Sequence, residues 1–201
     1  MNSYFRTPSV TLNLIIVNVL FYLVQTLLPF GNEMSWKLAL YSSHSHHFHV
    51  YQLIIYMFLH GGTTHLFFNM FGLWMFGRQL EYDLGARRFL TYYLICGVGA
   101  GLIQLLVSHF DPLMWNVPTV GASGAIFGIL LAFGVLHPNA MIMLIIPPIP
   151  MRAKYFVIIY GVLELLLGVF STSSSVAHFA HVGGMLWGWL LLRLWRVRRI
   201  I

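Results

Sequence analysis

A short apolar stretch that begins at residue 121 decides how this chain folds. It reads Gly121-Ala122-Ser123-Gly124-Ala125-Ile126-Phe127-Gly128 and continues without a charged residue to Leu136. Glycines four residues apart let another helix approach closely. The stretch is shorter than the roughly 20 apolar residues that cross a bilayer. We therefore expect a short helix from about Ser123 to Leu136. The loop before it should dip below the membrane surface, where irregular backbone must be packed in protein or face a water-filled cavity.

The rest of the chain is equally apolar. Its 201 residues are 59% hydrophobic and 8% charged, whereas a soluble domain carries about 25% charged residues. We therefore predict an all-α, polytopic membrane protein in which residues 1–201 form a single six-helix domain, with no room for a sizeable soluble domain. The expected spans are about Ser9–Leu28, Thr64–Leu80, Phe89–Phe110, Ser123–Leu136, Tyr155–Phe170 and Ala177–Leu194.

The basic residues predict the orientation of these spans. Six spans with both termini in the cytoplasm leave only Lys37 outside, as the positive-inside rule favours. The residues placed inside are Arg6, Arg78, Arg87, Arg88, Arg152, Lys154, Arg193, Arg196, Arg198 and Arg199. This distribution explains the net charge of +6 without a nucleic-acid partner, and the C-terminal cluster should lie against anionic lipid headgroups. No small-residue cleavage site follows the first span, so we expect it to be retained.

Residues 30–62 form a long external connection. Within it, Val50–Leu59 is apolar and aromatic but too short to span, which predicts an interfacial or partly embedded helix. Four histidines of this connection resemble a metal-binding tract, but no Cys or carboxylate completes a site, so we expect them to be solvated. They are His44, His46, His47 and His49. On the inner side, Pro147-Pro148-Ile149-Pro150 predicts a stiff turn.

Ser123 opens the short helix, where a nucleophile is favoured. Its small neighbours allow another group to approach the hydroxyl, and free N–H groups and the helix dipole favour negative charge at this end. A nucleophilic attack on a carbonyl creates such a charge. The alternative is a packing face without chemistry, and taken alone such a string is more often packing.

His181 lies inside the last span, in the string AHVGG, which continues to Gly188. An ionisable side chain within a span is costly and is a functional candidate, although a hydrogen-bonded core histidine is the alternative. Gly184 and Gly188 allow close approach to a neighbouring helix. If that neighbour is the short helix, His181 comes toward Ser123. His178 is the rival base and is expected nearer the outer surface and more solvated.

His65 and Asn69 are four residues apart and so share one face of the second span. They can satisfy each other in lipid, or they can form an oxyanion hole completed by the backbone N–H of Ser123. Spans two, four and six run in the same direction. His65, Ser123 and His181 should therefore lie at similar depth on the outer side, which a shared site predicts and chance packing does not.

Four ordered motifs make the chain similar to the bacterial rhomboid intramembrane serine proteases over nearly its whole length. They are Phe58-Leu59-His60-Gly61-Gly62 with His65 and Asn69, Phe76-Gly77 with Leu80-Glu81, Gly121–Gly128, and Ala180–Gly188. The resemblance implies a six-helix core around a water-accessible cavity open to the outer side. It implies that Ser123 is the nucleophile and His181 the general base. It also implies that His65, Asn69 and the Ser123 N–H stabilise the oxyanion, with no metal and no cofactor.

The chain departs from this family at two places. Many members carry Trp-Arg nine residues before the His that matches His60, where this chain has Tyr51 and Gln52. An Arg that could pair with Glu81 is thus absent, and the loop should be held differently. Phe127 stands where some members have a Tyr stacked on the catalytic His, so the ring is kept and the hydroxyl is lost.

The resemblance implies cleavage of transmembrane or juxtamembrane segments of single-pass or polytopic membrane proteins, in a bacterial inner membrane. Because the family uses a Ser–His dyad, no acid is expected beside the motifs in the outer half. Glu164 in span five should have a packing role. Span five and the loop Ser171–Val176 are the expected gate.

An inactive relative that binds transmembrane segments is one rival function, against which the retained Ser123 and His181 argue. A transporter with His181 and Glu164 as a proton relay is the other. The motifs leave the natural substrate and the oligomeric state open.

Overall fold

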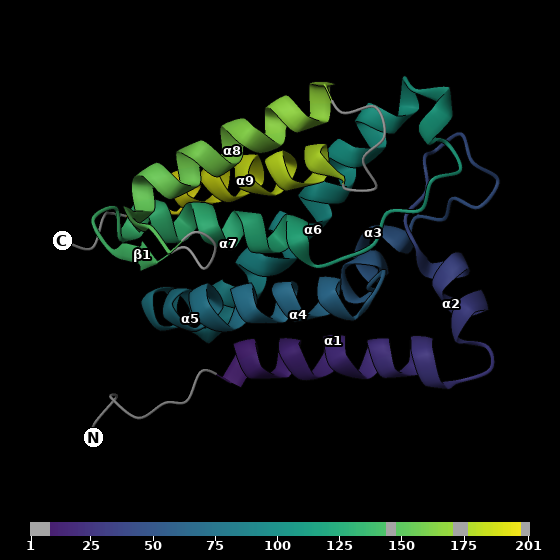
Figure 1. Cartoon of the computed structure of the whole chain (residues 1–201), viewed down its shortest axis with the longest axis horizontal. Coiled ribbons are helices and arrows are strands. Elements are labelled where there is room, and N and C mark those ends of the chain that lie inside the picture. Colours follow the sequence, from purple (N-terminus) through teal and green to yellow (C-terminus); the bar gives the residue numbers. More distant parts are fainter. Residues whose placement is uncertain (1–8, 144–147, 171–176, 198–201) are drawn as a thin grey trace.

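The computed structural model describes residues 9–143, 148–170 and 177–197. Its long helices run roughly side by side (Figure 1). The helices are α1 (Ser9–Leu27), α2 (Gly31–Leu38), α3 (Gln52–Ile55), α4 (Thr63–Gly72), α5 (Arg78–Leu84), α6 (Ala86–His109), α7 (Ser123–Leu136), α8 (Ala153–Phe170) and α9 (His178–Leu194). A π-helical segment, Leu73–Gly77, joins α4 to α5, and 3-10 turns occupy Tyr56–Phe58 and Pro112–Met114.

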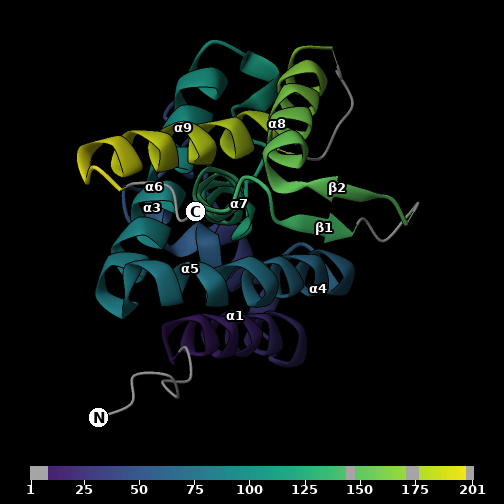
Figure 2. The same cartoon turned by 90° about the vertical axis from the view of Figure 1, so that its left-hand side faces the viewer.

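The short helix α7 is the centre of the bundle. Seen along its axis, it lies among α6, α8, α9 and the segment formed by α4 and α5 (Figure 2). Ten of its 14 residues are buried. At about 1.5 Å per residue the helix is about 21 Å long, less than the roughly 30 Å hydrocarbon layer. The predicted bounds, about Ser123 to Leu136, are confirmed, and the protein around α7 explains how so short a helix can lie in a bilayer.

Three of the described helices, α1, α6 and α8, are long and apolar enough to cross a membrane, with mean hydropathies of 1.9, 1.8 and 1.9. Their surfaces carry large apolar side chains that are exposed, including Leu20 on α1 at 54% and Ile158 on α8 at 62%. A water-soluble surface rarely carries so continuous an apolar belt. The prediction of a multi-pass, helical membrane protein is therefore confirmed.

A small β-hairpin interrupts the predicted all-helical chain. Strand β1 (Met141–Met143) pairs antiparallel with β2 (Pro150–Arg152) between α7 and α8. Of the predicted turn at 147–150, Pro150 begins β2, and residue 147 lies outside the described residues. The expected gate loop Ser171–Val176 and the basic residues Arg6, Arg198 and Arg199 lie outside them as well.

Helices α4, α7 and α9 begin at the same end of the bundle, on the right in Figure 1, where α2 and α3 also lie. The hairpin and the end of α9 lie at the opposite end. This arrangement brings the three segments that carry polar residues into register along the bundle axis. It is the parallel direction that the sequence predicted for these three segments.

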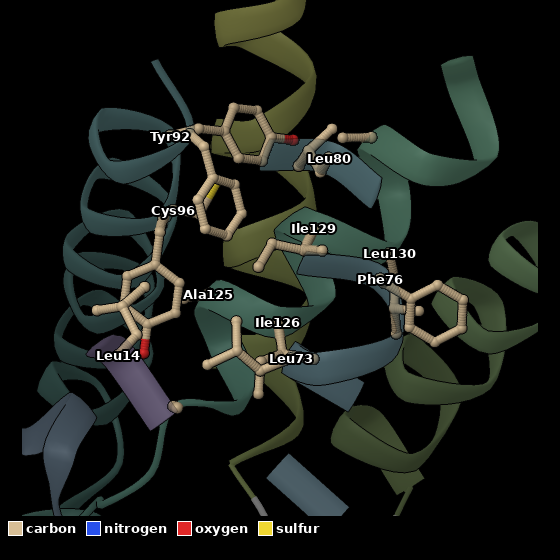
Figure 3. Close-up of a cluster of buried hydrophobic side chains, with 14 of the residues drawn as sticks. Leu14, Leu73, Phe76, Leu80, Tyr92, Cys96, Ala125, Ile126, Ile129 and Leu130 are labelled. Carbon is tan, nitrogen blue, oxygen red and sulfur yellow. The ribbon is translucent and has the colours of Figure 1, made fainter. Parts of the chain in front are cut away.

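The core fills the space between α7 and its neighbours. Figure 3 shows Leu73, Phe76 and Leu80 meeting Ile126, Ile129 and Leu130 of α7, with Tyr92, Cys96 and Leu14 on the other side. The Tyr92 hydroxyl donates a hydrogen bond of 2.8 Å to the carbonyl of Gly128. Cys96 is a buried free thiol among these side chains. The core therefore holds α7 from several sides and positions its first residue, Ser123.

The side chain of Gln52 holds the external connection. Its amide Nε2 donates to the carbonyls of His47 at 2.7 Å and Lys37 at 3.0 Å, and its Oε1 accepts from the His49 N–H at 3.1 Å. The helix predicted within Val50–Leu59 is present as α3 and the following 3-10 turn. In this chain the loop is thus held by a neutral side chain that ties three backbone groups together.

Glu81 does not belong to that loop. Its carboxylate accepts hydrogen bonds from the backbone N–H groups of Val10 and Thr11 and from the Thr11 hydroxyl, at 3.0, 2.8 and 2.7 Å. These are unpaired donors at the N-terminus of α1, where a negative charge is also favoured by the helix dipole. Glu81 therefore fastens α1 to α5 at the end of the bundle away from Ser123.

Candidate active site

Ser123 and His181 are in direct contact. Ser123 is the first residue of α7, and its Oγ lies 2.7 Å from Nε2 of His181, which stands one turn into α9. The His181 side chain is 9% exposed, and Ser123 is partly buried. A hydroxyl at this distance from an imidazole nitrogen is placed for proton transfer between the two.

Glycines on both helices make this contact possible. A Cβ on Gly184 would overlap the carbonyl oxygen of Gly124, and a Cβ on Gly128 would strike the side chain of Cys96. A Cβ on Gly188 would overlap the Tyr92 hydroxyl. Because Gly124, Gly128 and Gly184 carry no side chain, the backbones of α7 and α9 approach closely there, as predicted. Gly188 instead lies against Tyr92 and Cys96 of α6.

His65 and Asn69 lie beside Gly121, two residues before Ser123. A Cβ on Gly121 would fall 2.8 Å from Nε2 of His65 and 3.7 Å from Nδ2 of Asn69. The His65 Nδ1 accepts the Gly61 N–H at 3.4 Å, so the neutral ring carries its proton on Nε2, which faces Gly121. The Asn69 Nδ2 is buried and has no acceptor among the described residues. Two donors thus converge near the start of α7.

A cavity of about 880 Å³ contains these groups. Its lining includes His65, Gly121, Ser123 and His181, together with apolar residues such as Phe68. It lies at the end of the bundle where α4, α7 and α9 begin. Buried polar groups that converge on a largely apolar cavity are the usual pattern of a binding site.

The Phe127 ring covers one face of the His181 imidazole. It stacks on His181 with centroids 4.3 Å apart and planes inclined by 8°. The hydroxyl that some family members have at this position is absent, yet the stacked ring is present. The aromatic ring expected at this position is therefore present and stacked on His181.

The expectation that no acid lies near the site is wrong. Glu164 of α8 is buried, and its Oε2 lies 2.8 Å from Nδ1 of His181 and 2.6 Å from Nδ1 of His178. His178 is also buried, at 8% exposure, so the prediction that it is more solvated is wrong too. A signal was present in the sequence. Antiparallel helices joined by a short connection place residues near that connection at similar depth, and Glu164 lies two turns before the end of α8.

The same three residues are the group in the described ranges whose spacing suits a metal ion. One ligand atom each from Glu164, His178 and His181 lies within 4.8 Å of the others. The external histidines that resemble a metal tract are exposed, as expected; the His44 ring stacks on Trp115 at 4.5 Å and contacts the tilted ring of His109 at 4.3 Å.

Comparison with known proteins identifies the family. Residues 47–197 match the model described as Rhomboid domain. The chain is 34% identical over 138 residues to "Rhomboid protein 1, mitochondrial" of Saccharomyces cerevisiae, which covers 67% of this chain and 40% of that protein. It is 29% identical over 210 aligned residues to "Rhomboid protease AarA" of Providencia stuartii, which covers 91% of this chain and 71% of the relative. "Rhomboid protease GlpG" of Yersinia enterocolitica is 26% identical over 189 residues, covering 94% and 63%. This chain thus spans less than half the length of the yeast protein. Because the domain match covers well over half of the chain, this protein belongs to the rhomboid family.

Proposed function

We propose that this chain is an intramembrane serine endopeptidase that cleaves membrane-protein substrates within or beside their transmembrane segments. The observation that carries the proposal is the 2.7 Å contact between Ser123 Oγ and His181 Nε2, inside a cavity of a rhomboid-family protein. Ser123 is the nucleophile and His181 is the general base. Two of the relatives are called proteases by name.

The proposed reaction has two stages. In the first, His181 Nε2 takes the Ser123 hydroxyl proton while Oγ attacks the scissile carbonyl carbon. The protonated His181 then gives this proton to the leaving amine as the peptide C–N bond breaks, which leaves an acyl ester on Ser123. In the second, His181 takes a proton from water, the hydroxide attacks the ester, and the proton returns to Oγ as the acid product leaves.

The oxyanion of each tetrahedral intermediate is proposed to form near Gly121. There it receives hydrogen bonds from the Asn69 amide, from the His65 Nε2–H and from the backbone N–H of Ser123. In support of this, the Asn69 Nδ2 has no acceptor among the described residues, although it is buried. Such an amide makes its hydrogen bond only when charge develops on the substrate, which is how a site favours the transition state over the ground state.

The substrate must unwind locally before it is cut. The backbone N–H and C=O groups of a transmembrane helix are hydrogen-bonded to each other and are shielded from a nucleophile. Small or helix-weakening residues near the scissile bond ease this step. The cavity supplies the water that hydrolysis consumes. No cofactor or metal has a part in this scheme.

The proposal includes a six-span topology for one rhomboid-like domain over residues 1–201, with both termini in the cytoplasm. Under it, α4 with α5, α7 and α9 cross the bilayer beside α1, α6 and α8, and the cavity opens to the outer side. The proposed membrane is a bacterial cell membrane. The two bacterial relatives that align over more than nine-tenths of this chain support it, while the yeast relative is mitochondrial by name.

The test is cleavage of a model transmembrane substrate by the purified protein in liposomes. Ser123→Ala and His181→Ala should each abolish cleavage, while Ser43→Ala and His46→Ala, at exposed positions of the external connection, should cleave at the parent's rate. Cleavage that survives in Ser123→Ala would overturn the assignment of the nucleophile. A folded parent that binds the substrate without cutting it would instead favour an inactive rhomboid that binds transmembrane segments.

A further inference from the structure

Glu164 is a buried carboxylate at the contact between α8 and α9. Its side chain is 10% exposed, and one oxygen, Oε2, accepts hydrogen bonds from the Nδ1 atoms of both His178 and His181. A carboxylate in an apolar environment is costly unless charge-assisted hydrogen bonds compensate for the lost water. If this position served only to pack α8 on α9, an apolar residue there would give a more stable fold.

Two glycines determine which face of α8 packs against α9, and Glu164 lies between them on that face. Gly161 and Gly168 lie three residues before and four residues after it, on the same helix face. A Cβ on Gly168 would fall 3.2 Å from the ring of Phe179, and one on Gly161 would fall 3.0 Å from Cε of Met185. Both contacts are with α9. This packing sets the rotation of α8 and directs Glu164 toward the histidines.

The hydrogen bond determines which nitrogen of His181 carries the proton. An ionised carboxylate only accepts hydrogen bonds, so Nδ1 of His181 must be the donor. The neutral ring then has its lone pair on Nε2, the atom that lies 2.7 Å from Ser123 Oγ. This is the tautomer that a general base requires, and the opposite tautomer would place a proton between Nε2 and the hydroxyl.

We propose that Glu164 is a positioning residue that completes a Ser123–His181–Glu164 triad. The inference rests on the proposed serine protease function and deepens it. Glu164 holds His181 in the productive tautomer and orientation, and its negative charge stabilises the imidazolium that forms when Ser123 loses its proton. The proton remains on His181 until it passes to the leaving amine. His178 donates to the same Oε2 and holds the carboxylate in place.

The same cluster could instead bind a metal ion, and the distances argue against that occupant. Four N or O ligands at about 2.0–2.1 Å from a tetrahedral zinc ion lie about 3.3 Å from one another. The nitrogen-to-oxygen distances here are 2.6 and 2.8 Å, which are hydrogen-bond distances. A metal on Nδ1 of His181 would also replace the proton whose position the carboxylate controls.

The experiment measures kcat and KM in liposomes for the parent, Glu164→Gln, Glu164→Asp and Glu81→Gln. Glu164→Gln should lower kcat by about 10²-fold or more with KM within about twofold of the parent, because the amide has no charge and can present an N–H to Nδ1. Glu164→Asp keeps the charge on a shorter side chain, and its kcat should lie between those of the parent and Glu164→Gln.

Glu81→Gln is the matched control. It also removes a buried carboxylate that accepts several hydrogen bonds, but at the far end of the bundle. It should lower the Tm without lowering kcat. If Glu164→Gln likewise lowered only the Tm, the carboxylate would be structural and the inference would be overturned.

Further outcomes distinguish a failure of the proposed protease function from a failure of the proposed triad. A parent that does not cleave would defeat the proposed function itself. A parent that cleaves and loses activity with Ser123→Ala, beside a fully active Glu164→Gln, would defeat only the triad. If Glu164→Gln does not fold, Glu164→Asp decides, since an unchanged kcat there overturns the inference. The parent should keep its activity after dialysis against EDTA, and a loss that zinc restores would replace the triad with a metal site.

Discussion

Gly184 of α9 lies directly against the backbone of Gly124 in α7, so closely that a Cβ on Gly184 would overlap the Gly124 carbonyl oxygen. Gly124 directly follows Ser123, and Gly184 lies about one turn after His181, so this contact is next to both groups proposed to react. Gly184→Ala should therefore push the two helices apart. Overpacking of this kind costs roughly 1–3 kcal/mol, and the hydrogen bond between Ser123 and His181 should lengthen.

The measurement is the Tm in detergent together with the cleavage rate of the folded fraction, and both should fall. Gly62→Ala is the control, because a Cβ at Gly62 has no atom within 4 Å. Parent-like values for Gly184→Ala would mean that α7 and α9 can separate without loss of function.

Asn69→Ala should lower kcat by about 10²- to 10³-fold, the usual effect of removing one oxyanion donor, and change KM little. The matched control is Asn18→Ala. Asn18 is also a buried amide, but its Nδ2 donates to Leu14 within α1 at 2.7 Å. That variant should lose stability and keep its kcat. Equal losses of kcat in both variants would point to a general effect of buried amides and against an oxyanion hole.

Gly121→Ala should reduce activity for two separable reasons. Gly121 has a φ of +123°, which L side chains rarely adopt, and its Cβ would fall 2.8 Å from Nε2 of His65. Gly85→Ala isolates the first reason, because Gly85 has a φ of +79° and a Cβ there meets no atom within 4 Å. Both variants should lose thermal stability, but only Gly121→Ala should lose kcat. Similar kinetics for the two variants would argue against a functional role for the His65 ring.

Phe127→Leu should lower kcat about 2- to 10-fold. The stacked ring restrains His181 at a centroid distance of 4.3 Å, and aromatic pairs contribute about 0.5–1.5 kcal/mol. Phe127→Tyr keeps the ring and should stay near the parent's rate. Phe133→Leu removes an aromatic contact of 5.1 Å with Phe76, in the second half of α7, and serves as the control. A kcat unchanged in Phe127→Leu would show that the hydrogen bonds of His181 orient it without the ring.

Acidification should destabilise the fold through His60, in the connection before α4. Burial, and after it the neighbouring His65, lowers the pKa of His60 from 6.5 to about 4. Between these values the unfolded chain binds the extra proton and the folded chain does not, so the free energy of unfolding falls as the pH falls through this window. The contribution is fully present above pH 6.5. His60→Gln should flatten the dependence of the Tm on pH between 6.5 and 4, whereas His46→Gln, at an exposed position, should leave the slope unchanged.

The sequence by itself determined the helices and the central pair. Apolar runs predicted the bounds of α7 within a residue, because a helix in lipid must satisfy its own backbone. The glycines at 124, 128 and 184 predicted which faces of α7 and α9 meet, since close approach is possible only where side chains are missing, whereas Gly188 lies against α6. From the direction of the spans it followed that Ser123 and His181 lie at the same depth.

Only the tertiary structure decided which other groups reach that pair. Hydropathy does not reveal the rotation of α8, because most of its sides are apolar, and so it could not direct Glu164 toward His181. Nor could it show that Glu81 fastens α1 or that Gln52 holds the external connection. These contacts join residues from separate helices and loops. They depend on the rotation and axial position of each helix against its neighbour, which packing in three dimensions sets.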